Sequence, residues 1–168
     1  LDVKRLLHAL RDEILRISNA DCASIVLYGQ FDPAREPVIQ QMIGCERGVG
    51  LAPVELKVTR SGESLIISDF SMDAILPPHD NARSAVYMPI LYQNRALGLM
   101  SVHSNRPAFF DVETAELLHM LAAQAGIALN NAYRYQVEKE HSELMRRRAE
   151  TLVRLTDGKT VEDLMTAL

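Results

Sequence analysis

The order of helical and extended segments in this 168-residue chain predicts an α+β fold, with an antiparallel sheet backed by the two terminal helices. A stripe of apolar residues at helical spacing fills residues 1–17, and a long helical run begins near residue 112. Between them, short β-branched segments alternate with turn residues, which is typical of strands joined by hairpins. The expected order is helix, two strands, short helix, three strands, helix.

The first half of the chain predicts a helix followed by a hairpin. Asn19 and Asp21 end the helical stripe of residues 1–17. The segment CASIVLYG at 22–29 is apolar and β-branched and predicts a buried strand. A turn-forming connector leads to VIQQMIG at 38–44, which predicts a second strand paired with the first.

The second half predicts three more strands. A short helical run ends at a Ser-Gly pair, and LIISDF at 65–70 predicts a short strand. The segment 71–84 contains two adjacent prolines, which exclude regular structure there. Strands are expected at 84–93 and 95–104, joined by a tight Gln-Asn turn.

The last predicted helix begins at Asp111, a suitable N-cap, with Glu113 and Glu116 placed where the helix dipole favours acidic groups. Leucines and alanines recur at steps of three and four and predict one packed face. The small residues that would let this helix lie close to a sheet are Ala122, Ala125 and Gly126.

Beyond Tyr135 the helical run becomes densely charged, and only an intermittent apolar stripe remains. Such a segment cannot bury itself against its own domain, so we expect it to pair with a second copy in a parallel dimer. A solvated single helix is the alternative. The apolar positions are Val137, Leu144, Met145, Leu152 and Leu155.

The chain end resembles the chain start. TVEDLMTAL at 160–168 aligns with DVKRLLHAL at 2–10, apolar residue on apolar residue. We therefore expect residues 1–136 to form one domain, 137–157 a helical connector, and 158–168 the start of a following module such as a second copy of the domain.

Composition narrows the class of protein. A net charge of −4 argues against nucleic-acid binding, and no apolar run is long enough for membrane insertion. Cys22 and Cys45 are too few for a disulfide scaffold or a cysteine-based zinc site. They are predicted to be reduced, buried, small apolar side chains, which favours a cytoplasmic setting.

The segment ALGLMSVHSNRPAFFDVETAELLHMLAAQAGIALNNAYRY at 96–135 resembles the C-terminal half of a GAF domain. The shared features are a glycine in the last strand, a phenylalanine and a cap residue before the helix, and an LAxQAGIALxNAxxY-like run. Upstream, ARSAVYMPI resembles the penultimate strand of the family with its proline, and SGESLIISDF resembles the segment before the pocket loop. The resemblance covers residues 1–136.

The resemblance implies a non-catalytic sensory module of a bacterial signalling protein, such as a histidine kinase or diguanylate cyclase. It implies a five- or six-stranded antiparallel sheet with the terminal helices on one face and a loop-covered pocket on the other. Homodimerisation through the N- and C-terminal helices would pass a signal to a separate effector domain. An empty-pocket module that only dimerises is the alternative.

The resemblance places a small-molecule pocket between loop 71–83 and strand 97–103. Arg83, His79 and His103 would make polar contacts to the ligand; alternatively, His103 only caps the end of the sheet. Asp69 either lies at the pocket rim or only caps the following turn. Alternation along the strand puts Leu99, Ser101 and His103 on one face. The full set of candidate ligand-binding residues is Asp69, Phe70, His79, Arg83, Leu99, Ser101 and His103.

No cofactor is expected, and haem is the alternative. PPHDNARS resembles the PPHPPMR-like stretch of haem-binding GAF modules, whose histidine ligates iron; here His79 and Arg83 keep that spacing. Where those proteins place an aromatic hydroxyl, this chain has Ser101. No other metal ligand is expected.

Two further GAF activities are weighed from the residues. The cyclic-nucleotide signature and a cysteine placed for bilin attachment are both missing. Free methionine-sulfoxide reductases share the GAF fold and use pocket cysteines, but Cys22 and Cys45 have no base beside them in the sequence. No catalytic residue is therefore predicted.

Overall fold

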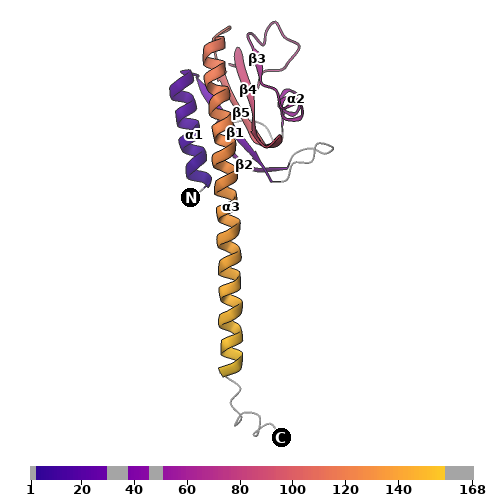
Figure 1. Cartoon of the computed structure of the whole chain (residues 1–168). Helices are drawn as coiled ribbons and strands as arrows, with labels where there is room; N and C mark the ends of the chain where they lie inside the picture. The colour runs from indigo at the N-terminus through magenta and orange to yellow at the C-terminus, as the bar shows by residue number, and fades with distance from the viewer. Residues whose placement is uncertain (1–2, 30–37, 46–50, 158–168) are drawn as a thin grey trace. The chain divides into compact units, whose positions relative to one another are not determined.

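The computed structural model describes residues 3–29, 38–45 and 51–157 (Figure 1). The chain divides into two compact units, Leu1–Asn131 and Ala132–Leu168. The elements are α1 (Val3–Ser18), β1 (Cys22–Tyr28), β2 (Ile39–Ile43), α2 (Pro53–Ser61), β3 (Leu65–Ile67), β4 (Ser84–Tyr92), β5 (Arg95–Ser104) and α3 (Val112–Asp157).

The first unit contains a five-stranded sheet in the order β2-β1-β5-β4-β3 (Figure 1). Every neighbouring pair is antiparallel. Strands β1 and β5 pair over six residues, from Cys22 opposite His103 to Leu27 opposite Gly98. This arrangement confirms the predicted α+β fold.

The helices and strands end near the residues predicted from the sequence, and residues with positive φ lie at several of these ends. Gln93 and Asn94 both have positive φ, 48° and 62°, as a two-residue turn between twisted antiparallel strands requires. Asn19, with φ of 50°, ends α1. Gly62, at φ 70°, ends α2, and its N–H donates to the carbonyl of Val58.

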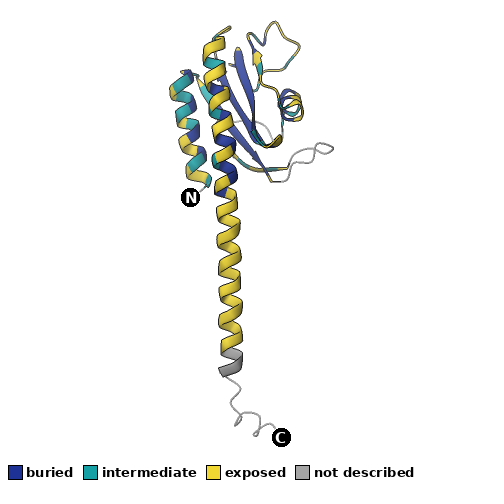
Figure 2. Ribbon diagram, in the orientation of Figure 1, coloured by how far each residue is buried: buried dark blue, intermediate teal, exposed yellow. Residues whose placement is uncertain are grey.

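One face of the sheet packs on both terminal helices, as predicted (Figures 1 and 2). Strand residues such as Ile25, Val86 and Met100 share a buried core with Ile14 of α1 and Leu118 of α3. Helix α3 approaches the sheet so closely that a Cβ on Gly126 would lie 2.0 Å from the Leu91 carbonyl oxygen. The prediction that small residues permit this approach is confirmed.

Helix α3 begins as expected: the Thr114 N–H donates to Asp111 Oδ1 at 2.7 Å. Hydrogen bonds from Thr114 hold the pKa of Asp111 below its ordinary value. The helix continues without a break to Asp157, and residues 133–153 are all exposed (Figure 2). The predicted following module at 158–168 lies outside the described residues.

Over the described residues, no helix combines the length and the apolar character that a bilayer crossing demands.

Candidate functional site

The second face of the sheet carries a cavity of about 580 Å³, within the size range of small-molecule sites. Ser24 of β1, Tyr87 of β4 and His103 of β5 form its floor. The start of α2 and a loop with two prolines enclose it. The lining residues beyond the floor are Cys45, Leu51, Ala52, Pro53, Val54, Glu55, Lys57 and Ala74–His79.

Two of the seven predicted ligand-binding residues line this cavity, His79 and His103. Leu99, Ser101 and His103 share one face of β5 because they are spaced two residues apart. Leu99 lies opposite Val26 of β1, and Ser101 lies opposite Ser24. Leu99 and Ser101 are almost fully buried and do not belong to the cavity lining.

Asp69, Phe70 and Arg83 also lie outside the lining, where they close the base of the loop. Arg83 donates to both carboxylate oxygens of Asp69, the shorter bond being 2.8 Å, and this pairing holds the pKa of Asp69 far below its ordinary value. The Ser71 N–H donates to Asp69 Oδ1 at 3.0 Å, which confirms the turn-capping alternative for Asp69. Phe70 is 5% exposed and packs in the core beneath.

Two polar atoms on the cavity wall are buried without a hydrogen-bond partner among the described residues: Ser24 Oγ and His79 Nε2. Ser24 is only 2% exposed. A buried polar group left without a partner costs about 1–3 kcal/mol. A bound molecule that supplies hydrogen bonds to these two atoms therefore gains that free energy.

Helix α2 contributes wall residues that the sequence did not indicate as ligand contacts. Glu55 is 3% exposed, and its carboxylate accepts a hydrogen bond from the Ala52 N–H at 2.7 Å. This bond fixes the first turn of α2 over the cavity. A glutamate at the third position of a helix is typical of an N-terminal capping box. The sequence pattern therefore indicates capping by Glu55 and gives no sign of a ligand contact.

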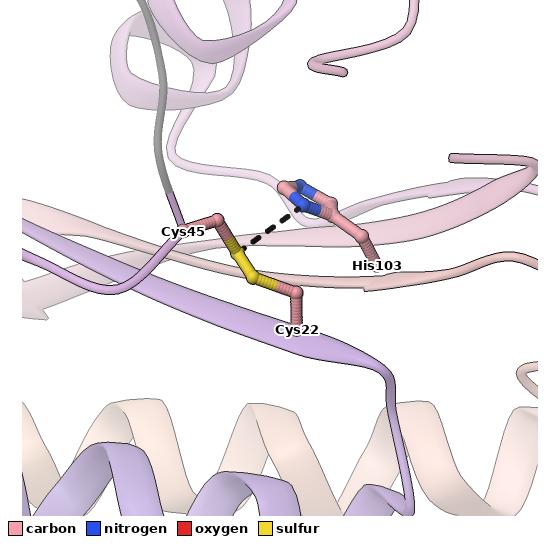
Figure 3. The surroundings of a disulfide bond; sticks show 3 residues. All are labelled: Cys22, Cys45 and His103. Atoms are coloured by element: carbon pink, nitrogen blue, oxygen red, sulfur yellow. Dashed lines mark hydrogen bonds between the residues drawn. A yellow bond between two sulfur atoms is a disulfide. The ribbon is translucent and has the colours of Figure 1, made fainter. Parts of the chain in front are cut away.

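The bonding and burial of the two cysteines differ from the prediction (Figure 3). Cys22 and Cys45 are half-buried and joined in a disulfide, with their Cα atoms 6.1 Å apart, so the interpretation as reduced, buried, apolar side chains is wrong. Gly44 makes the pairing feasible: its φ is +125°, and a Cβ there would lie 2.2 Å from the Ala23 carbonyl oxygen. Only glycine lets the chain turn against β1 at this point.

His103 stands beside this pair. Its Nδ1 lies 4.0 Å from Cys45 Sγ, and it is the direct cross-strand neighbour of Cys22 (Figure 3). The premise that the cysteines lack an adjacent base therefore fails. The histidine comes from β5, more than fifty residues away in the chain, and only the β1–β5 pairing reveals it.

Comparison with known proteins settles the family. The GAF domain model matches residues 2–129. The chain belongs to the GAF domain family. The fold agrees, since solved GAF structures superpose on it: the GAF domain of a phosphoenolpyruvate-protein phosphotransferase from Acinetobacter matches with a TM-score of 0.55 at 16% identity, over 74% of this chain and 80% of that one.

Two further proteins of known name are similar to this chain. It is 27% identical over 135 residues to the anaerobic nitric oxide reductase transcription regulator NorR of Aeromonas hydrophila subsp. hydrophila, over 74% of this chain and 27% of the regulator. The chain thus spans about a quarter of that relative's length. The free methionine-R-sulfoxide reductase of Neisseria meningitidis matches with a TM-score of 0.63 at 17% identity, over 76% of this chain and 77% of that one. GAF domains are sensory modules and are generally non-catalytic.

Proposed function

We propose that this GAF domain is the non-catalytic sensor of a bacterial signal-transduction protein and binds a small polar molecule in the cavity above β1, β4 and β5. The observation that carries the proposal is a pair of polar atoms, Ser24 Oγ and His79 Nε2, that find no hydrogen-bond partner within the described part of the chain and lie on the wall of a cavity of about 580 Å³. Leu51, Val54 and Ile75 supply the apolar part of the wall. The effector therefore combines an apolar body with at least two hydrogen-bonding groups.

The exposed part of α3 supports a second element of the proposal, homodimerisation and transmission. Val137 and Leu144 are seven residues apart, as are Met145 and Leu152, and each is at least 48% exposed. A parallel partner helix would cover these side chains, each buried leucine contributing about 2 kcal/mol. Arg146 and Lys139 near this stripe keep the association weak, which suits a joint that changes arrangement when ligand binds.

A thermal-shift screen tests ligand binding. The 168-residue chain is heated with nucleotides, nitrate and small carboxylic acids, and a binder is expected to raise Tm in proportion to the logarithm of its concentration. His79→Ala removes one polar contact and should reduce that shift, whereas Glu63→Gln, an exposed change outside the cavity lining, should preserve it. A hit unaffected by His79→Ala would contradict the proposed site, and a complete screen without a hit favours the empty-pocket dimerisation module.

Two alternative functions, haem binding and thiol chemistry, are each favoured by one observation. His79 Nε2, which has no hydrogen-bond partner in the described ranges, fits an axial haem ligand, and a Soret band in the freshly purified protein would establish haem. The cysteine pair beside His103 fits thiol chemistry, as in a reductase. Reduction of free methionine sulfoxide by the purified chain with a dithiol, lost on Cys45→Ser, would replace the sensor proposal with an enzyme.

A further inference from the structure

We propose that the reduced form of this chain binds one thiophilic divalent metal ion, such as Zn²⁺, through Cys22 Sγ, Cys45 Sγ and His103 Nδ1. These three donor atoms lie within 4.8 Å of one another at the edge of the cavity (Figure 3). The proposal goes beyond the sensor function, because it holds whether or not an organic effector occupies the cavity.

The spacing of the donors is close to what a tetrahedral ion requires. With Zn–S bonds of about 2.3 Å and Zn–N bonds of about 2.0 Å, a sulfur and a nitrogen ligand stand about 3.5 Å apart. Cys45 Sγ and His103 Nδ1 are 4.0 Å apart. Two thiolates on the same ion stand about 3.8 Å apart, which needs only that the sulfurs separate once the disulfide is reduced. Rotations of the cysteine side chains bring the three atoms to these distances.

The backbone holds the three ligands in place before any ion binds. Cys22 and His103 are cross-strand neighbours where β1 begins and β5 ends, and opposite Cβ atoms in such pairs stand about 4.5–5.5 Å apart. The turn at Gly44 brings Cys45 over the same position. His103 is 3% exposed, and its ring lies against those of Tyr87 and His79, with centroids 5.8 and 5.5 Å away. Ligands on packed strands lose little conformational entropy on binding.

The donor set selects the class of metal. Thiolate and imidazole ligands favour zinc and similar ions over Mg²⁺ or Ca²⁺, which prefer oxygen. Three protein ligands leave the fourth tetrahedral position open. Because Cys45 and His103 also line the cavity, that position is accessible to water or a small ligand there. The sequence analysis argued only against a cysteine-based zinc site, and it named His103 as a pocket residue without placing it beside the cysteines.

Thiol oxidation controls the site. Binding needs two thiolates, and each thiol releases a proton as it ligates the ion. One hydrogen peroxide molecule converts the two thiols to the disulfide and yields two water molecules, which removes both sulfur ligands. One dithiothreitol molecule restores both thiols and becomes a cyclic disulfide.

The test is a Co²⁺ titration of the 168-residue chain, reduced with dithiothreitol and freed of reductant without oxygen. We expect saturation at one equivalent, with a thiolate-to-cobalt charge-transfer band and the intense visible bands of a tetrahedral ion, and displacement by Zn²⁺. The peroxide-oxidised chain should show none of these bands until it is reduced again. Absence of saturable binding by the reduced chain, or equal binding by the oxidised chain, would overturn the proposal.

Variants locate the ion. His103→Gln and Cys45→Ser should weaken the affinity for the ion by more than about 100-fold. Even the loss of a residue that only hydrogen-bonds to a metal ligand lowers metal affinity by about 10–100-fold. The matched control is His8→Gln, which removes an exposed histidine of α1 and should bind as the wild type does. Circular dichroism checks that each variant folds; should one not fold, the comparison of reduced and oxidised wild type still decides. The thermal-shift screen reads the effector separately, so either proposal can fail alone.

Discussion

The two faces of the sheet are built from the same strands, yet only one of them is closed. Towards α1 and α3, Ile25, Met88 and Met100 are fully buried in a continuous apolar core. Towards α2, the same strands present Ser24, Tyr87 and His103 to a cavity. The helix face therefore stabilises the domain, whereas the cavity face exposes polar atoms to the cavity, and a bound molecule can form hydrogen bonds with them.

The largest expected effect lies on the helix face. Leu118 is completely buried between α3 and the sheet. Leu118→Ala should lower the free energy of unfolding by about 2–5 kcal/mol, through lost apolar burial and the space it leaves. Urea denaturation measures the change. A loss below 1 kcal/mol would show that this face is not the stabilising one.

A comparison within α3 gives the second prediction. The part before residue 131 packs on the sheet, whereas residues 133–153 are exposed and carry the apolar stripe. We expect the 168-residue chain to sediment as a dimer at high micromolar concentration and a chain ending at Tyr135 as a monomer. The matched change is Leu144→Glu, which should also give monomers without altering Tm of the domain. Two monomeric species would remove the basis for transmission through this helix.

On the cavity face, a substitution should have a small effect of the opposite sign. Ser24→Ala removes a buried hydroxyl that has no hydrogen-bond partner among the described residues. Because that hydroxyl is desolvated without compensation, the variant should be as stable as the wild type or more stable by up to about 1 kcal/mol. Denaturation of the ligand-free protein measures this. A loss of more than 1 kcal/mol would mean that Ser24 contributes to folding rather than to a site.

The smallest effect concerns the loop base and depends on pH. Arg83, through its hydrogen bonds, lowers the pKa of Asp69 below the ordinary value of 3.8. The carboxylate thus stabilises the folded state at pH values above 3.8, and this contribution is lost as the pH falls through the lowered pKa. Asp69→Asn should lower Tm slightly at pH 7 and by a smaller amount near pH 2, because the contribution begins to fall only below 3.8. An equal loss at both pH values would exclude the ion pair as the cause.

The sequence predicted the fold well because its signals are local. The Gln93–Asn94 turn, the Asp111 cap and the small residues from Ala122 to Gly126 are each contained in a short stretch. The site was predicted only in part because its residues meet through strand pairing. His79 and His103 could be named from loop and strand patterns, whereas Ser24 and Cys45 reach the cavity through the pairing of β1 with β2 and β5. The start of α2 reaches it because α2 packs on β4 and β5.

We expect a small molecule to bind on the cavity face of the sheet and not on the helix face. Two-dimensional NMR of the isotope-labelled chain tests this with a hit from the thermal-shift screen. Saturable shifts are expected for the backbone amides of Ser24, His79 and Tyr87, and none for those of Leu118 and Ala122. Shifts centred on α1 and α3, with none around the cavity, would contradict it.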